Sequence, residues 1–219
     1  MAARGKKTNG RKPAGKTAAA PTTEDRILDA TLAVAARDGW RAASLARIAA
    51  AAELDLAALY AQFPSKPALL AGLLRRIDRA VLAGDAPDAA EGSPRDRLFD
   101  VVMRRFDALQ PWRAGLLAIA RDGVDPLSGL ALAGPFARSM AWMLEAAGIP
   151  SGGLAGRMRA VGLAVVYARV FRAWLEDDSA DLGKTMAALD RGLALAERWA
   201  SALPGVHSQG LAARPTGDD

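Results

Sequence analysis

The chain has 219 residues, of which 51% are hydrophobic and 24% charged, and its formal net charge is +5. It contains no cysteine and a single histidine, His207, which leaves almost nothing from which to build a disulfide, a thiolate metal site or a serine–histidine triad. No apolar run reaches the roughly 20 residues that a membrane span needs, and the basic N-terminus lacks the apolar stretch of a secretory signal. We therefore expect a cytoplasmic protein that is not an enzyme and holds no metal or other cofactor.

The positive charge is concentrated at the N-terminus. Six basic side chains and no acid precede Glu24, namely Arg4, Lys6, Lys7, Arg11, Lys12 and Lys16. Setting these six aside from the 29 basic residues leaves 23 against 24 acids, so the rest of the chain is close to neutral. Residues 1–21 show no periodicity and are predicted to form a disordered basic arm. Such an arm either contacts DNA phosphates without sequence preference or only keeps the protein soluble.

Ala, Leu and Arg dominate the composition and favour helix over strand throughout. Four closely spaced helices are predicted first, and each follows a polar N-cap: Thr22, Ser44, Asp55 and Ser65. Gly39 ends the first of them, and the fourth continues to about Ala83. Two short helices joined by a tight turn, with another helix beside them, are typical of a DNA-binding helix-turn-helix. We assign residues 22–83 to such a domain together with its connecting helix.

Residues 84–93 are rich in Gly, Asp, Pro and Ala and mark the predicted boundary to a second domain. Five helical segments are predicted beyond it: 94–109, 111–121, 126–147, 154–176 and 180–202. Gly134 and Pro135 are a candidate site for a kink in the third segment. The predicted fold class is therefore all-α with about nine helices. A larger helical domain covers residues 94–203, and residues 204–219 form a disordered tail.

The stretch from Arg26 to Leu74 resembles the DNA-binding region of the TetR family (TetR/AcrR type) of bacterial regulators. The residues that carry the resemblance are, in order, Arg26-Ile27-Leu28-Asp29-Ala30, Gly39, Ser44-Leu45, Ile48-Ala49, Ala52, Leu59-Tyr60, Phe63, Ser65-Lys66 and Leu69-Leu70. The combination is specific because helix lengths, caps and the Tyr-x-x-Phe-x-x-Lys spacing must coincide. The resemblance implies a dimeric transcriptional regulator, expected to be a repressor, that binds a palindromic operator in double-stranded DNA.

The resemblance also implies roles for individual residues. The helix from Asp55 to Gln62 would enter the major groove, where its side chains face base edges. Tyr60 and Lys66 would contact phosphates, and Ser44 would offer its hydroxyl and the neighbouring helix N-terminus to another phosphate. The complete set of expected DNA-binding residues is Arg41, Ser44, Arg47, Ala57, Ala58, Tyr60, Ala61, Gln62 and Lys66.

The sequence departs from the family pattern at the start of the recognition helix, where Leu56, Ala57 and Ala58 replace the usual polar residues. Only Gln62 on this helix carries a bidentate hydrogen-bonding head of the kind that reads adenine. Two explanations remain open. Specificity can come from DNA shape, the basic arm and dimer spacing. Alternatively, the chain is a lipid- or quinone-binding accessory protein that has lost sequence-specific DNA binding, as in proteins of ubiquinone biosynthesis that resemble TetR regulators.

The second domain carries apolar and aromatic residues suited to a core and to a cavity for a small apolar effector. The residues expected to line that cavity are Phe106, Trp112, Leu116, Phe136, Met140, Met143, Tyr167 and Phe171. We expect the effector to be apolar or weakly polar, and anionic if Arg113 or Arg169 faces inward.

In the family, the last two helices pair with their symmetry mates, which here means residues 154–176 and 180–202. Both segments carry more apolar surface than one buried face needs, in agreement with a homodimer interface. The mechanism implied by the resemblance is a population shift. The free dimer holds its two recognition helices at operator spacing, and the effector favours a different spacing.

Overall fold

The computed structural model describes residues 20–84 and 92–202, with side chains described up to residue 198. These residues form nine α-helices and one short 3-10 helix (η1), and no strand is present among them. The elements are α1 (Thr23–Asp38), α2 (Leu45–Ala51), α3 (Leu56–Gln62), α4 (Lys66–Leu82), α5 (Pro94–Leu109), η1 (Gln110–Trp112), α6 (Arg113–Asp122), α7 (Pro126–Ala146), α8 (Gly153–Leu175) and α9 (Gly183–Ala202). The predicted all-α class is therefore confirmed. The basic arm, apart from its last two residues, and the tail at 204–219 lie outside the described residues.

The helix starts lie where the polar caps predict them. Thr22 and Asp25 form a capping box, in which the Asp25 N–H donates to the Thr22 hydroxyl at 3.1 Å and the Thr22 N–H donates back to the Asp25 carboxylate at 3.2 Å. Ser44, Asp55 and Ser65 each accept a hydrogen bond from the backbone N–H three residues later. These local bonds fix the first four helices before any long-range packing is considered.

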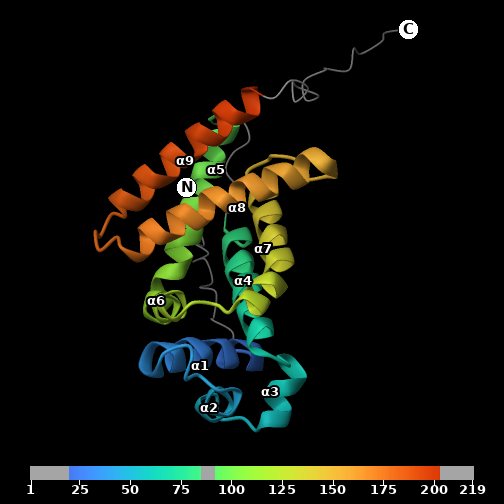
Figure 1. The fold of residues 1–219 in the computed structure, drawn as a ribbon, viewed down its shortest axis with the longest axis vertical. Helices are drawn as coiled ribbons and strands as arrows, with labels where there is room; N and C mark the ends of the chain where they lie inside the picture. The colour runs from blue at the N-terminus through green and yellow to red at the C-terminus, as the bar shows by residue number, and fades with distance from the viewer. Residues whose placement is uncertain (1–19, 85–91, 203–219) are drawn as a thin grey trace, which may run out of the picture.

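Two hydrophobic cores are stacked along the long axis of the molecule, and α4 belongs to both (Figure 1). We call the unit around the α1–α3 core the head and the unit around the α5–α9 core the body. The first half of α4 packs Leu69 and Leu73 into the head, while its second half packs Ile77 and Val81 into the body. The head is therefore attached to the body through a continuous helix.

A second joint connects the head to the body through α1 and α6. Gly115 on α6 lies so close to α1 that an added Cβ would be 2.6 Å from the Leu32 carbonyl oxygen. Ile119 from α6 completes the head core. The close approach therefore requires glycine at this position, and it ties α6 to the head.

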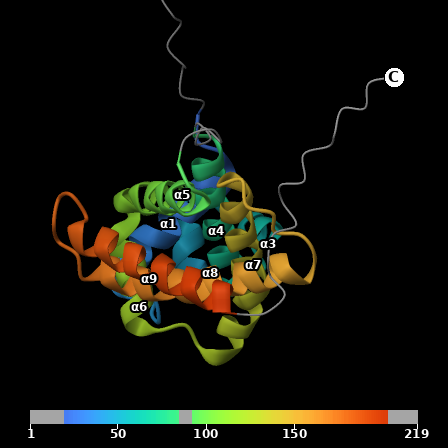
Figure 2. The ribbon, with the colours of Figure 1, turned by 90° about the horizontal axis from the view of Figure 1, so that it is seen from above.

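The helices of the body run close to their predicted bounds. α7 continues through Gly134 and Pro135 as one helix, although Pro135 cannot donate a backbone hydrogen bond. α8 and α9 lie side by side (Figures 1 and 2). α9 begins at Gly183 rather than at residue 180, because residues 177–182 form the turn between the two helices.

Within the described ranges, no helix is both long enough and apolar enough to cross a membrane.

Candidate nucleic-acid interface and effector core

The α2–α3 unit has the form of a helix-turn-helix. After α2 the chain reverses over Ala52–Asp55, where Glu53 adopts a positive φ of 55° and the Leu54 N–H donates to the Ala49 carbonyl at 2.9 Å. Leu59 then fixes α3 to the head core, where it is 1% exposed. The opposite side of α3 is left facing solvent at the far end of the head from the body (Figure 1).

The structure brings most of the DNA-binding residues predicted on α3 onto its exposed side. Ala57, Tyr60, Ala61 and Gln62 are exposed, whereas Ala58 is only half-buried toward the core. Tyr60 is 69% exposed, so its hydroxyl is available to an external acceptor. That these residues contact DNA stays a prediction.

Lys66, which is predicted to contact a phosphate, is bonded to Trp40 within the protein. Its ammonium donates to the Trp40 carbonyl at 2.6 Å and lies 4.1 Å from the centre of the Trp40 ring. Burial lowers the pKa of Lys66, and the nearby carboxylates of Asp122 and Asp125 oppose that shift. Because an ammonium has three donors, a phosphate can still be bound without breaking the Trp40 contact.

The two arginines predicted to assist are also engaged within the molecule. The Arg41 backbone N–H donates to the Asp122 carboxylate at 2.9 Å, and its Nε donates to the Asp122 carbonyl at 3.1 Å. The guanidinium of Arg47 lies 3.5 Å from the Asp38 carboxylate. The Arg47 backbone N–H donates to the hydroxyl of Ser44, the N-cap of α2. Arg41 therefore connects the head to the end of α6 and supplies a further link to the body.

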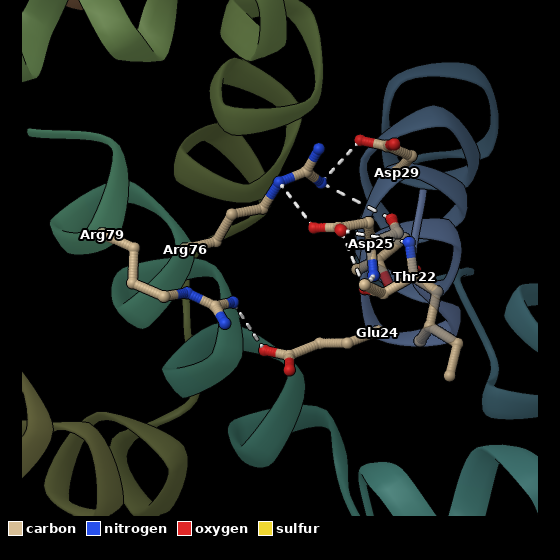
Figure 3. A network of polar contacts seen from close by, with 8 residues as sticks. Thr22, Glu24, Asp25, Asp29, Arg76 and Arg79 are labelled. Atoms are coloured by element: carbon tan, nitrogen blue, oxygen red, sulfur yellow. Dashed lines mark hydrogen bonds and ion pairs between the residues drawn. The ribbon is translucent and has the colours of Figure 1, made fainter. Parts of the chain in front are cut away.

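Ion pairs hold α1 against α4 (Figure 3). Arg76 reaches Asp29 at 2.6 Å and Asp25 at 3.4 Å, and Arg79 reaches Glu24 at 3.0 Å. The guanidinium of Arg76 also lies 4.5 Å from the centre of the Trp112 ring. Since Arg76 contacts both α1 and the start of the α6 segment, it joins the head to the body at the middle of α4.

The eight predicted effector residues lie in and around the body core. Phe106, Met140, Met143 and Tyr167 are buried, whereas Trp112, Leu116, Phe136 and Phe171 are partly buried and pack against the core. Four of them form a series of ring contacts with Tyr167 at its centre: the Tyr167 ring lies 5.1 Å from Phe106, 5.8 Å from Phe136 and 6.1 Å from Phe171. The structure thus brings these four together as one aromatic cluster, which Trp174 extends.

The body core contains a polar cluster, and this cluster is not among the sites predicted from the sequence. Arg105 is fully buried, and its guanidinium pairs with the carboxylate of Asp78 and donates to the Tyr167 hydroxyl at 3.2 Å. Asp78 also accepts a hydrogen bond from the Ser139 hydroxyl at 2.6 Å. Burial raises the pKa of Tyr167. The four side chains come from α4, α5, α7 and α8, so this cluster joins the helix that carries the head to the centre of the body.

A signal for this cluster is present in the sequence. Asp78 lies between Ile77 and Val81 on the apolar side of α4, and Arg105 lies beside Phe106 on the apolar side of α5. A charged residue within each of two apolar faces predicts a buried ion pair, because an unpaired charge there would be too costly. The arginines considered for an inward role behave differently: Arg169 is exposed and Arg113 is partly buried.

Arg113 contacts the C-terminal end of α8. Its Nη2 donates to the carbonyls of Leu175 at 3.0 Å and Asp177 at 3.1 Å, and its guanidinium pairs with Asp178 at 3.0 Å. The guanidinium carbon lies 5.8 Å from the centre of the Trp174 ring. Within the described part of the chain, two buried donors have no acceptor, Arg113 Nε and Trp174 Nε1.

Comparison with known proteins agrees with this architecture. Residues 27–73 match the family model described as bacterial regulatory proteins, tetR family. The HTH-type transcriptional repressor KstR of Mycolicibacterium smegmatis is 43% identical over 86 residues, which are 39% of this chain and 42% of the relative. KstR of Mycobacterium tuberculosis is 39% identical over 70 residues, which are 28% of this chain and 32% of the relative. The chain therefore spans less than half the length of these curated relatives.

Solved structures share the fold over most of the chain. A TetR transcriptional regulator from Nitrosomonas europaea superposes with a TM-score of 0.63 and 24% identity, over 81% of this chain and 99% of that one. A TetR transcriptional regulator from Rhodococcus sp. RHA1 gives 0.60 and 21%, over 80% and 94%. These likenesses establish the fold of head and body together, while the family match identifies the head. The head therefore matches the family model of the tetR bacterial regulatory proteins, and the described chain has the fold of solved TetR transcriptional regulators.

Proposed function

We propose that this protein is a dimeric DNA-binding transcriptional regulator, and specifically a repressor, whose operator affinity changes when a small apolar molecule binds in the body. The observation that carries the proposal is α3, which is capped by Asp55, anchored by Leu59 and exposed along its other side within the segment that matches the family. Family members are regulators rather than enzymes, in agreement with the prediction from the sequence. Since the DNA target is chromosomal, we place the protein in the cytoplasm.

Groups able to bind phosphate on α3 and at the starts of α2 and α4 support DNA binding. Tyr60 offers an exposed hydroxyl, Lys66 offers two further N–H donors, and the N-terminus of α2 after Ser44 offers unpaired backbone N–H groups. Base reading depends on fewer groups, since Gln62 alone on α3 can make a bidentate contact with a base. We therefore expect affinity to come mainly from phosphates, and specificity to depend strongly on the spacing of two heads.

The body supports a dimer through its apolar surface on α8. Four exposed side chains follow one face of this helix at spacings of four, three and four residues: Leu154, Met158, Val161 and Val165. Leu195 on the neighbouring α9 is also exposed. A second copy that packs there by two-fold symmetry would bury this face and set two α3 helices toward successive turns of a palindromic site.

The test of DNA binding uses a fluorescent duplex of the upstream intergenic DNA and a scrambled duplex, across a salt series. We expect specific binding that Tyr60→Ala weakens about tenfold, because a hydrogen bond to a charged phosphate contributes about 1.5 kcal/mol or more. Trp142→Ala is the matched control, since it removes another exposed aromatic residue, on α7 in the body. Equal binding to both duplexes at every salt concentration, unaffected by Tyr60→Ala, would reject the proposal.

One observation favours a second candidate function. The exposed side of α3 is mostly apolar, and Leu56 there is 55% exposed. This surface offers few of the polar side chains with which a recognition helix reads bases, as expected of a lipid or quinone carrier that has lost sequence-specific DNA binding. Under this alternative the purified protein carries a lipid or quinone that mass spectrometry detects, and it binds DNA weakly and without sequence preference.

A further inference from the structure

We propose that the body binds a neutral apolar molecule through a carbonyl-type oxygen that accepts hydrogen bonds from Trp174 and Arg113. The inference rests on the proposed function in assigning the effector to the body, and it narrows the chemical class of that effector. The site comprises Trp174, Arg113 and the aromatic rings that touch Trp174.

Two buried N–H donors beside each other lack an acceptor in the part of the chain that the structure describes. Trp174 is 0% exposed, and its indole N–H has no hydrogen-bond partner among the described residues. Arg113 Nε–H is also buried and unpartnered, although the other guanidinium nitrogens of Arg113 are bonded to carbonyls and to Asp178. Leaving a buried donor unpaired costs about 1–3 kcal/mol, and native proteins seldom tolerate it without a water or a ligand. Two such donors on neighbouring side chains indicate a missing acceptor.

The surroundings of the Trp174 indole are apolar. The Trp174 ring lies 5.5 Å from Phe171 and 5.9 Å from Phe106, and both residues belong to the predicted effector set. An acceptor that binds here therefore needs an apolar body to lie against these rings. This environment favours an organic molecule with a polar oxygen over a small ion.

A ligand can reach Arg113 from the surface. A surface hollow of about 740 Å³ lies between α5 and the α8–α9 turn, and Arg113 is part of its wall. Met103, Leu182 and Met186 supply apolar surface in the same wall. Methionine side chains adapt readily to different shapes, so they can move aside for a ligand. Arg113 therefore joins an accessible hollow to the buried indole.

The charge of the hollow determines the class of ligand. Its wall carries four exposed carboxylates, Asp100, Asp107, Asp178 and Asp181. The single arginine in the wall, Arg113, is already paired with Asp178 at 3.0 Å. An anionic ligand would be repelled by the carboxylates that remain uncompensated, whereas a ketone, ester or amide would meet no such penalty. We therefore expect a neutral ligand rather than the anionic one that the sequence leaves open.

The position of Arg113 also suggests how binding reaches the head. Arg113 is the first residue of α6, and Asp122 at the end of α6 binds Arg41 in the head. Gly115, two residues after Arg113, packs on α1. A ligand that draws Arg113 toward Trp174 would move α6 and with it the α1 contact.

The experiment is an NMR titration of protein labelled with ¹⁵N-tryptophan. The chain has five tryptophans, so it gives five indole N–H signals, and Trp174→Phe identifies the signal of Trp174. The probes are methyl decanoate, decanoate and decane, which share an apolar chain and differ in the acceptor and its charge. We expect methyl decanoate to shift the Trp174 proton downfield, as a new hydrogen bond does. Decane should leave this signal without a downfield shift, and decanoate should bind at least tenfold more weakly than the ester.

Variants provide the second readout. Trp174→Phe should weaken binding of methyl decanoate about tenfold while the exposed Trp142→Phe leaves it unchanged. If Trp174→Phe does not fold, the signal is assigned in the wild-type protein from its contacts with Phe171, and the titration alone decides. Binding that leaves the Trp174 signal in place, tighter binding of decanoate, or no binding of the ester would each overturn the inference. Because no DNA is present, these outcomes are independent of the test of operator binding.

Discussion

Asp78 occupies a position that few carboxylates hold, on an apolar helix face beside a fully buried guanidinium. Arg105 cannot lose its proton in a protein, so its charge has to be balanced where it lies. Asp78 supplies that balance, and Ser139 and Tyr167 complete the hydrogen bonding of the pair. Removing one member of a buried ion pair destabilises a protein more than replacing both members by apolar residues, because the remaining charge is left unpaired in a medium of low dielectric constant.

We therefore expect Asp78→Asn to lower the free energy of unfolding by about 3 kcal/mol. Denaturant titration followed by circular dichroism measures this change. Asp100→Asn is the control, since it makes the same chemical change at an exposed position on α5. Equal stability of the two variants would mean that the Asp78 carboxylate does not balance Arg105.

At the scale of elements, the turn between α8 and α9 depends on a buried acid. Asp177 is 2% exposed, and its carboxylate accepts the Thr185 N–H and the Thr185 hydroxyl at 2.8 Å each. Burial raises the pKa of Asp177, but the hydrogen bonds from Ser179 and Thr185 outweigh burial and hold the pKa well below its ordinary value of 3.8. The carboxylate thus fixes the first turn of α9 to the end of α8.

The lowered pKa predicts a pH dependence of stability. The folded protein binds the Asp177 proton less tightly than the unfolded chain, so the contribution is complete above pH 3.8 and declines as the pH falls below it. Asp177→Asn should be less stable than wild type at pH 7, and the difference should shrink as the pH falls below about 4. Thermal unfolding of both proteins between pH 7 and pH 2.5 measures it. A difference that stays constant over this range would contradict the assignment.

At the scale of the whole molecule, two heads can bind one palindrome only if two copies associate. Met158 is 60% exposed at the middle of the apolar face of α8. A charge there would be buried without a partner in a dimer, so Met158→Glu should produce monomers and abolish specific DNA binding. Sedimentation equilibrium measures the mass. Leu127→Glu on α7 is the control, since Leu127 is equally apolar and more exposed but lies outside α8. If the Met158→Glu protein is still a dimer, the dimer interface does not include this face of α8.

The sequence predicts those parts of the molecule that depend on nearby residues. The caps at Thr22, Ser44, Asp55 and Ser65 each act within three residues, and each is found as predicted. The sequence predicts the start of α9 three residues too early, because Asp177 binds Thr185 across the turn and no local signal indicates that contact.

In the candidate sites too, residues whose placement depends on nearby sequence are predictable, and those that depend on distant contacts are not. Tyr60 and Gln62 could be placed on the exposed side of α3, because the apolar spacing of Leu59 and Phe63 fixes the opposite side. The charges on the apolar sides of α4 and α5 indicate a buried pair, but the partners of Arg105 come from helices far away in the sequence and are identified only by the structure. The unpartnered indole of Trp174 likewise has no local signal.

The shared helix α4 has a consequence for the length of the chain. An α-helix advances about 1.5 Å and turns about 100° with every residue. One alanine inserted after Leu74 would replace no residue and would favour the helix, yet it would rotate the first half of α4 by about 100° against the second. The head would then face a different direction from the body, and Asp78 could not meet Arg105 while Leu69 and Leu73 kept their places. The rotation of the first half of α4 relative to the second therefore tolerates no change of even one residue in length. Insertions or deletions in α4 should be far more harmful than substitutions on its surface.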